Sequence, residues 1–375
     1  MSGFFGKAAR AVTEAAEQGR LRLFMVAIAR KLTAFFTICW VVGLLLIWLA
    51  LRFVGEQNIT TAFLMYLPQT LWLLPAVPLS VLSVVFHRGC LAVIALTVAL
   101  AVWLWMGFEW RLFKTPIKES ESQSLSLMTY NRGQHMNQSL QPFKDATRPD
   151  LLLLQDASNR AAGYLTSPEY AEFKHGRSIG EHTLLSRYPI VEATLLEAHP
   201  AGNKIKNARF VIEWNSSFVS IYSVHLATPR NVLSSYMRGA FLWGVLGLPG
   251  TPWEEKRRAY QMFWDQHMTD VRSLLADVLQ DTNPALVAGD FNAPHIGYVY
   301  RLMTSELGDA HAQAGGEFGF TFPGTTRNPL SFGGPWLRID YILHNEKWRV
   351  LDCVTEPSRP SQHRALFAKF SPRSE

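Results

Sequence analysis

The sequence predicts two structural regions: an all-α transmembrane region of about three helices, followed by an α/β domain in which two packed sheets lie between helices. Apolar residues are concentrated before residue 110, although the mean hydropathy of the whole chain is only +0.04. Short apolar runs recur after residue 124, at lengths typical of buried strands. With 375 residues, the chain also exceeds the ~150 residues of a typical single domain.

Three stretches without a charged side chain predict the transmembrane region, which we place at residues 32–110. They are Leu32–Leu51, Ala62–Phe86 and Cys90–Phe108. At a rise of ~1.5 Å per residue, each is long enough for a helix to cross a hydrocarbon core of ~30 Å. None carries the polar stripe that marks a helix of a soluble protein. Three prolines in the second stretch leave open whether that stretch is kinked or re-entrant.

The basic residues predict the orientation in the membrane. Residues 1–31 contain six Lys/Arg and are predicted to form a basic amphipathic helix on the membrane surface. Summed over alternate sides of three crossings, seven Lys/Arg face four, which places the N-terminus in the cytoplasm and the C-terminal domain outside it, as in a bacterial inner membrane. If the second stretch does not span, the domain returns to the cytoplasmic side. The polar residues 111–123 are expected to form a linker.

The C-terminal domain is expected over residues 124–371. Strands are predicted at Leu125–Tyr130, Leu151–Leu154, Thr183–Leu185, Ala208–Trp214, Phe218–Val224, Ala285–Ala288, Leu337–Leu343 and Ala365–Phe370. Glu254–Gln280 has apolar residues at helical spacing, and Pro294–Leu307 is a shorter helix candidate. This order of elements favours two packed sheets with helices outside.

Polar side chains follow several of the predicted strands, where a rigid sheet can hold them in a fixed geometry. They are Asn131, Asp156, His225, Asp290, Asn292, Asp340 and His363. Taken singly, an Asn or Asp at a strand end usually caps a turn, and a lone His usually packs or lies on the surface. Their repetition in one domain predicts a shared site.

The motifs around these residues resemble the endonuclease/exonuclease/phosphatase superfamily, which includes DNase I-like nucleases, inositol polyphosphate 5-phosphatases and neutral sphingomyelinases. In family order they are Thr129-Tyr130-Asn131, Pro149-Asp150-Leu151-Leu152-Leu153-Leu154-Gln155-Asp156, Leu184-Leu185-Ser186-Arg187-Tyr188-Pro189-Ile190, Ser223-Val224-His225-Leu226, Gly289-Asp290-Phe291-Asn292, Arg338-Ile339-Asp340-Tyr341 and Ser361-Gln362-His363. The resemblance covers residues 124–371. It implies a four-layered α/β sandwich.

The resemblance also implies a role for each catalytic residue. Asp290 would orient and activate the attacking water, and Asn292 and His225 would bind phosphate oxygens. His363 would contact the phosphoryl group, with Asp340 supporting the far nitrogen of its imidazole. These roles match what phosphodiester hydrolysis needs: a deprotonated water in line with the leaving oxygen and neutralisation of the phosphoryl charge.

On the family pattern, Asp156 and Asn131 would hold a divalent metal. Carboxylates, amides and histidines are a hard-ligand set that suits Mg²⁺ or Mn²⁺. Three cysteines, two of them in the apolar stretches, exclude a Cys-rich zinc site. Two positions depart from the family: Asp156 stands where Glu is usual, and Gln362 stands where Asp usually precedes the last His. The second change removes a negative charge near the metal.

The substrate class is predicted from charge and from one apolar insertion. Residues 119–375 carry 25 Lys/Arg against 26 Asp/Glu, which does not favour nucleic acid, because DNA binding calls for a basic surface. Asn231–Trp253, which includes Phe241-Leu242-Trp243, is either a buried crossover or an apolar lip that dips into the bilayer. We therefore expect a membrane-anchored phosphodiesterase or phosphatase acting on a lipid head group or small phosphodiester. A membrane-tethered nuclease and a non-catalytic membrane receptor for phosphorylated ligands are the alternatives.

Overall fold

The structure is a computed structural model that describes residues 2–110, 124–133, 139–196, 207–237, 253–324, 333–359 and 362–373. The chain divides into two compact units. One contains Met1–Trp48 and Gln69–Trp105; the other contains Leu49–Pro68 and Met106–Glu375. The predicted linker at residues 111–123 and the residues Phe241-Leu242-Trp243 lie outside the described residues.

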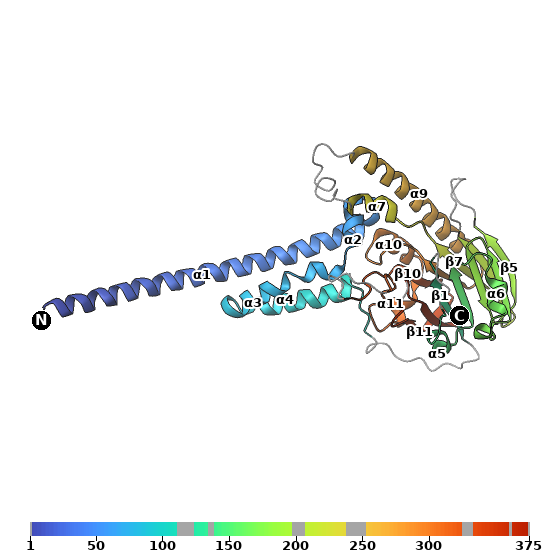
Figure 1. Ribbon diagram of the computed structural model, residues 1–375, viewed down its shortest axis with the longest axis horizontal. Helices are drawn as coiled ribbons and strands as arrows, with labels where there is room; N and C mark the ends of the chain where they lie inside the picture. Colours follow the sequence, from blue (N-terminus) through green and yellow to red (C-terminus); the bar gives the residue numbers. More distant parts are fainter. Residues whose placement is uncertain are drawn as a thin grey trace. The chain divides into compact units, whose positions relative to one another are not determined.

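The first unit is helical (Figure 1). It contains most of α1 (Ser2–Phe53), a 3₁₀ turn at Gln69–Leu73, α3 (Ala76–Phe86) and α4 (Gly89–Leu100), which continues as one π-helical turn at Ala101–Trp105. Its small core consists of Ala76, Leu79, Cys90 and Ile94, with Ala34, Trp40 and Val98 packed against it. Residues 1–31 were predicted as a helix on the membrane surface; they are helical from Ser2, but they continue without a break into the first apolar stretch as part of α1.

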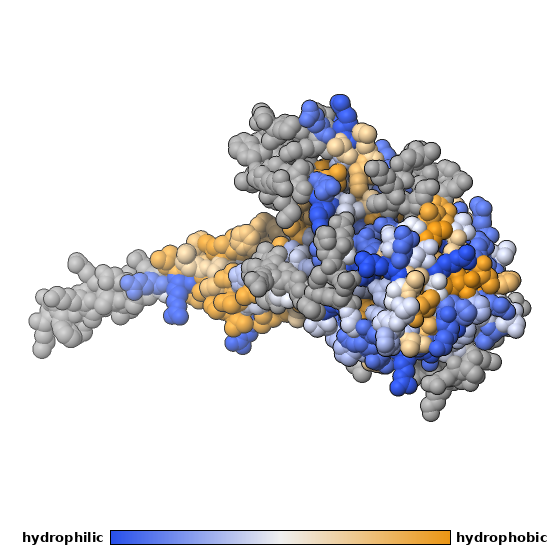
Figure 2. Space-filling view, turned by 45° about the vertical axis from the view of Figure 1, so that its right-hand side comes forward, coloured by the Kyte–Doolittle hydropathy of each residue, from blue (hydrophilic) through white to orange (hydrophobic). Residues whose placement is uncertain are grey.

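The surface of the helical unit is largely apolar, and its described part is mostly orange in Figure 2. Large apolar side chains point outward along all three helices; Leu23, Val77 and Leu96 are each more than 60% exposed. In water such a surface is unfavourable, whereas in lipid it is the expected outer face. Gln18–Phe53 and Gln69–Phe86 are long and apolar enough to cross a membrane, and Gly89–Trp105 is a shorter apolar helix.

The predicted stretch Ala62–Phe86 is not one helix. It begins in α2 (Ile59–Met65), is interrupted around Pro68 and Pro75, and continues as α3. Proline lacks the amide hydrogen that the helix ladder needs, which explains both interruptions. Residues before Gln69 belong to the second unit, so the apolar segment available to a membrane begins later than the composition suggested.

The second unit is built on two six-stranded sheets with helices on their outer faces (Figure 1). The first sheet has the order β11 (Trp348–Thr355), β12 (Leu366–Pro372), β1 (Leu125–Asn131), β2 (Leu151–Gln155), β4 (His182–Ser186) and β3 (His175–Ile179). The second has the order β5 (Ile190–Leu195), β6 (Ala208–Trp214), β7 (Ser217–His225), β8 (Ala285–Asp290), β10 (Asp340–His344) and β9 (Gly308–Asp309).

Alternation along the strands explains the layers. In β1, Leu125 and Leu127 lie in the core between the sheets, while Met128 and Tyr130 lie in a second core on the outer face. In β7, Ile221 faces the inner core and Tyr222 faces the helices. Successive side chains of a strand point to opposite faces, so strands buried on both sides read as continuous apolar runs. The predicted four-layered α/β sandwich is confirmed.

The outer helices vary in length. The longest is α9 (Trp253–Gln280), which matches the predicted helix and buries Tyr260, His267 and Val271 against the second sheet. The others are α5 (Phe143–Thr147), α6 (Ala161–Leu165), α7 (Arg230–Met237), α10 (Tyr298–Thr304) and α11 (Ala310–Ala314). Helix α7 covers the start of the apolar insertion Asn231–Trp253, for which the sequence predicted no helix.

The predicted strands are present, with one correction: β10 begins at Asp340 rather than Leu337, which forms only an isolated bridge with Phe322. Strands β3, β5, β9 and β11 were not predicted. Both β3 and β5 lie at sheet edges and are half-exposed, so their sequences lack the continuous apolar run of a central strand.

Candidate active site

The site forms where strands of both sheets end. In the second sheet, β7 and β8 are parallel and place His225 beside Asp290, while antiparallel β10 places Asp340 on the other side of Asp290. In the first sheet, parallel β1 and β2 place Asn131 beside Gln155. The carboxyl ends of parallel strands meet at one edge of a sheet, which explains why the sequence places polar residues after these strands. Gly289, at φ +138°, permits the close approach, since a Cβ there would lie 2.0 Å from the Val224 carbonyl oxygen.

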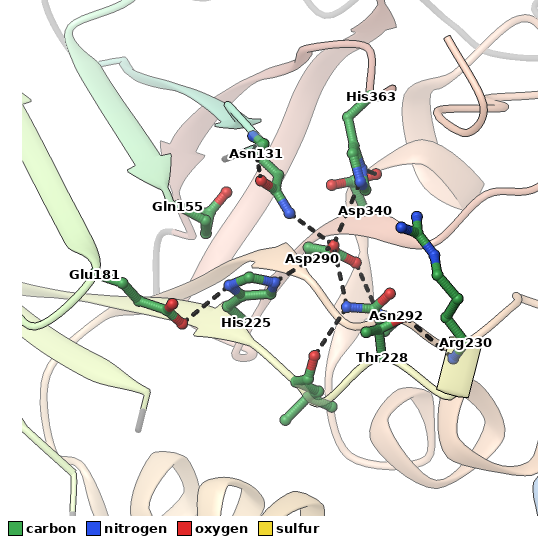
Figure 3. A network of polar contacts seen from close by, with 12 residues as sticks. Asn131, Gln155, Glu181, His225, Thr228, Arg230, Asp290, Asn292, Asp340 and His363 are labelled. Carbon is green, nitrogen blue, oxygen red and sulfur yellow. Dashed lines mark hydrogen bonds and ion pairs between the residues drawn. The ribbon is translucent and has the colours of Figure 1, made fainter. Parts of the chain in front are cut away.

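Asp290 is the centre of the site and is 1% exposed (Figure 3). Its Oδ2 accepts a hydrogen bond of 2.8 Å from the Asn131 side-chain amide. The same oxygen lies 3.7 Å from Nε2 of His363 and 3.9 Å from Nε2 of His225. Burial, with the neighbouring charge of Asp340, raises the pKa of Asp290 above its ordinary value. A raised pKa makes the carboxylate a stronger base toward a nearby water.

His363 is held from behind by Asp340. Nδ1 of the imidazole lies 3.0 Å from Oδ2 of Asp340, and both side chains are almost fully buried. Burial by itself would lower the histidine pKa, but the charges of Asp340 and Asp290 outweigh it and raise the pKa of His363 to about 9. The imidazole is therefore a cation at neutral pH, with Nε2 directed toward Asp290.

His225 is held in the same manner by Glu181, which lies between β3 and β4. Nδ1 of His225 is 2.9 Å from Oε1 of Glu181. Burial opposes protonation here too, but the hydrogen bond to Glu181 and the charge of Asp290 raise the pKa of His225 to about 9. Two histidines thus approach one aspartate, each fixed by its own carboxylate (Figure 3).

Asn292 is fixed through both its backbone and its side chain. Its backbone amide donates to Asp290 Oδ1 at 2.8 Å, and its side-chain amide donates to the Leu226 carbonyl at 2.8 Å. Its φ of 48° lies in the left-handed region, which Asn adopts more readily than most residues. The structure thus brings Asn131, His225, Asp290, Asn292, Asp340 and His363 together.

Asp156 lies at the same edge but belongs to a separate group. Its carboxylate, that of Glu181 and a ring nitrogen of His225 lie within 4.8 Å of one another, and all three residues are half-buried. The two carboxylates of this group supply oxygen ligands that suit a divalent cation. Asp290, Asp340 and His363 form a second such group, which is fully buried. Asn131, the other predicted ligand, uses its oxygen to accept from the Gly133 amide at 2.9 Å.

A sequence profile described as "Endonuclease/Exonuclease/phosphatase family" matches residues 132–363. The chain belongs to this family. Structures similar to the chain include a humanised TDP2 from D. rerio, at 13% identity and a TM-score of 0.47, covering 66% of this chain and 99% of that one. An endonuclease/exonuclease/phosphatase from Beutenbergia cavernae is 15% identical, with a TM-score of 0.44, and the match covers 67% of this chain and 72% of that one. One from Bacteroides vulgatus is 14% identical, with a TM-score of 0.46, and the match covers 67% of this chain and 99% of that one. No curated protein matches the chain significantly.

Enzymes of this family generally catalyse phosphoester hydrolysis and typically depend on a divalent metal. Of the two departures from the family pattern, Asp156 has Glu181 as a neighbouring carboxylate. Gln362 is exposed, and its backbone carbonyl accepts from the Gly324 amide at 2.6 Å. The lost charge at residue 362 is thus at the surface of the site rather than inside it.

Sequence reasoning missed Glu181 and Gln155 as site residues. Gln155 is fully buried and donates to Ser223 Oγ at 3.2 Å, which joins the two sheets below the site. Gln155 directly precedes Asp156 in one of the family motifs, but nothing in the sequence indicated that its side chain would join the two sheets. Glu181 follows Gly180 in a turn between an unpredicted strand and a predicted one. Only the pairing of β3 with β4 brings it to the site.

Proposed function

We propose that the protein is a membrane-anchored, metal-dependent phosphodiesterase that acts on a lipid head group or a small phosphodiester. The observation that carries the proposal is the buried Asp290 carboxylate, with the Nε2 atoms of His225 and His363 at 3.9 and 3.7 Å. A carboxylate of raised pKa beside two imidazolium groups combines a base for water with cationic donors for phosphoryl oxygens.

Asp290, His363 and His225 then each have one role in hydrolysis. Asp290 orients the attacking water and accepts its proton. His363 donates from Nε2 to a phosphoryl oxygen while Asp340 fixes its Nδ1, and His225 donates to another phosphoryl oxygen while Glu181 fixes it. These donors are preorganised, so little reorganisation is needed as charge develops in the transition state.

Asp156 and Glu181 would hold the divalent cation, and Mg²⁺ or Mn²⁺ suits this oxygen-rich set. When bound, the cation supplies positive charge that neutralises the phosphoryl group and the leaving oxygen. Glu181 also offers a reason why Asp can replace the usual Glu at residue 156: the second carboxylate compensates for the shorter side chain.

A pocket that is lined in part by the residue following Asn131 supports a small substrate. It has a volume of about 280 Å³ and is lined by Arg132, Ser139, Arg160, Gly163, Tyr164, Ser167, Glu169 and Tyr170. Arg132 directly follows Asn131, and its guanidinium lies 5.6 Å from the centre of the Tyr164 ring. This volume is just below the ~300–1,000 Å³ that is typical of ligand pockets, and it fits a head group better than a polymer. Its two arginines outnumber its one carboxylate, that of Glu169, which favours an anionic or strongly polar group.

The second unit supports one orientation in the membrane. Residues 49–68 and 106–375 form one compact unit, and Ile59 and Ala62 of the earlier segment lie in its core. Residues 69–105 therefore leave the catalytic domain and return to it on the same side of a bilayer, so they cross an even number of times. If α1 crosses once, the domain lies opposite the N-terminus, outside the cytoplasm under the positive-inside rule.

The orientation is tested with exposed positions of the second unit, in a Cys39→Ser background. Gln57→Cys and Lys347→Cys should both react with a membrane-impermeant maleimide from outside spheroplasts, and a reporter fused after Glu375 should function outside the cytoplasm. Labelling of only one of the two cysteines, or a reporter that works only in the cytoplasm, contradicts the proposal.

The activity is tested with purified protein in detergent, against phospholipids, inositol phosphates, nucleotides, DNA and bis-p-nitrophenyl phosphate, each with Mg²⁺, Mn²⁺ or EDTA. We expect metal-dependent release from phospholipid or a small phosphodiester. Preferential cleavage of DNA would instead favour the tethered nuclease, and metal binding without turnover would favour the receptor. The predicted lip is tested by Phe241→Ser with Trp243→Ser, which should reduce activity on vesicles and spare the soluble substrate.

A further inference from the structure

The segment Arg52–Tyr66, here called the clamp segment, precedes the family-matched residues 132–363 but contacts the loop after Asp290 and the first turn of α10. It does so at three points. The Arg52 guanidinium donates to the His295 carbonyl at 3.2 Å, the Glu56 carboxylate accepts from the amides of Tyr298 and Val299 at 2.7 and 3.3 Å, and the Tyr66 hydroxyl donates to the Asn292 carbonyl at 2.6 Å. The clamp segment thus holds residues 292–299 along their length.

The clamp segment is fixed to the catalytic domain by its own burial. Ile59 and Ala62 are 3% and 1% exposed in the core that α9 and β7 share. The Tyr260 hydroxyl donates to the Glu56 carbonyl. Gly297 allows the carboxylate to approach, because a Cβ there would lie 2.3 Å from Glu56 Oε1. The clamp segment is therefore part of the folded catalytic domain and not a linker that only contacts its surface.

Tyr66 is the member of the clamp segment that reaches the active site. Its hydroxyl bonds the carbonyl of Asn292, whose backbone amide and side chain bond Asp290. Tyr66 is itself fixed from the other side, since Trp336 Nε1 donates to its carbonyl at 3.1 Å. The space left among Tyr66, Tyr260 and Asn292 is only about 10 Å³, room for about one water molecule.

We infer that Tyr66 is a positioning residue for Asn292 and, through it, for Asp290. Asn292 has a left-handed backbone and lies after the end of β8, so strand pairing does not set the direction of its carbonyl. The Tyr66 hydrogen bond sets that direction, and the hydrogen bonds from Asn292 to Asp290 then hold the carboxylate. The inference rests on the proposed hydrolase function, and it assigns part of the active-site geometry to a segment between two apolar helices.

The first test is Tyr66→Phe in the full chain, which removes the hydroxyl and keeps the ring. The matched control is Tyr222→Phe, which removes another buried tyrosine hydroxyl, one that donates to Asp281 at 2.8 Å on the helix-facing side of β7. We expect Tyr66→Phe to lower kcat about tenfold and to change KM less than about twofold. The control should retain wild-type kcat with a similar loss of thermal stability.

The second test is a double-mutant cycle with Asp290→Asn, which removes the carboxylate that Asn292 holds. If Tyr66 acts through Asn292 on Asp290, Tyr66→Phe should cost less than about twofold in kcat in the Asp290→Asn background. Trp336→Phe, which releases Tyr66 from its other side, should give a smaller loss that also disappears in that background, and it serves if Tyr66→Phe does not fold.

The outcomes separate the two proposals. A wild-type chain without hydrolytic activity on any substrate defeats the proposed function. An active wild type with unchanged kcat in Tyr66→Phe, or with the same tenfold loss in both backgrounds of the cycle, overturns the positioning role and leaves the proposed function intact.

Discussion

Asp290 lies between two carboxylate–histidine pairs. The contact distance within each pair is nearly the same, but the two carboxylates differ in how exposed they are to solvent. The inner contacts are 3.0 Å for Asp340 with His363 and 2.9 Å for Glu181 with His225. The side chain of Asp340, at the start of a central strand, is 3% exposed, whereas that of Glu181, in a turn, is 27% exposed. The first pair is fixed by the sheet, while the second can adjust to a ligand. We therefore expect the Asp340 pair to control the chemical step and the Glu181 pair to control metal binding.

The largest expected effect comes from removing the residue that both pairs share. Asp290→Asn keeps the size of the side chain and removes its base, so kcat should fall by about 10²–10⁴. The control is Asp281→Asn, which removes a carboxylate bonded to Arg209 and Tyr222 away from the site. It should lower the melting temperature and leave kcat unchanged. Wild-type turnover in Asp290→Asn would remove Asp290 from the mechanism.

The next effect compares the two pairs directly. Asp340→Asn should lower kcat about 10²-fold, because His363 loses the charge that keeps it protonated and an amide can also present its NH₂ group to Nδ1. Glu181→Gln should lower kcat less than Asp340→Asn when the metal is saturating. Steady-state kinetics at several metal concentrations measure both. Equal losses of kcat at saturation would show that the two pairs have the same role.

Metal binding gives the converse comparison. Glu181→Gln and Asp156→Ala should each weaken Mn²⁺ binding about 10- to 100-fold, since each removes a carboxylate from one cluster. Asp340→Asn should leave the affinity within a few-fold of wild type. Isothermal titration calorimetry measures this without substrate. If Asp340→Asn weakens binding most, the cation belongs to the buried group of Asp290, Asp340 and His363 instead.

The two pairs also differ in how far the sequence predicts them. Asp340 and His363 lie in motifs beside apolar strands, so their convergence follows from strand ends meeting at one edge. Glu181 lies in a turn whose preceding strand has a half-exposed pattern, and only the register of β3 on β4 places it next to His225. Pairing across distant segments is set by tertiary packing, which a local pattern does not record.

The same limit applies to the N-terminal region. Composition predicted apolar helices, and α1, α3 and α4 are apolar on their exposed faces. It assigned Ala62–Tyr66 to a membrane span, whereas these residues pack against the catalytic domain. Apolar residues look alike whether lipid or a protein core covers them, and Ile59 and Ala62 show the second case. The charge of Glu56, six residues before Ala62, was a local sign in the sequence that this part of the chain lies outside the lipid.

The pH dependence sharpens the comparison. His363 has its pKa raised to about 9, so the pair with Asp340 stabilises the fold fully below pH 6.5 and loses this contribution as pH rises through about 9. Activity that needs the imidazolium should fall above the same pH. Asp340→Asn should move this loss of activity to lower pH, so that its deficit at pH 8.5 is several-fold larger than at pH 6.5. A basic limb unchanged in Asp340→Asn would assign the proton to another group.

The smallest expected effect concerns Gln362, the residue beside His363 that lacks the usual charge. Gln362→Asp adds a carboxylate next to the Asp340 pair, whereas Gln362→Asn is neutral and of the same length, and therefore isolates the charge. Because residue 362 is exposed, solvent screens the new charge, and an exposed ion pair contributes ~0.2–1 kcal/mol, at most about fivefold. We expect Gln362→Asp to lower the half-saturating Mg²⁺ concentration by about two- to fivefold in low salt. The shift should be smaller in about 0.5 M salt, where the Debye length is only ~4 Å. Gln362→Asn should behave as the wild type. A shift shared by both variants would mean that side-chain length, not charge, matters at this position. No shift in either variant would mean that the cation binds at the Glu181 pair without any influence from residue 362.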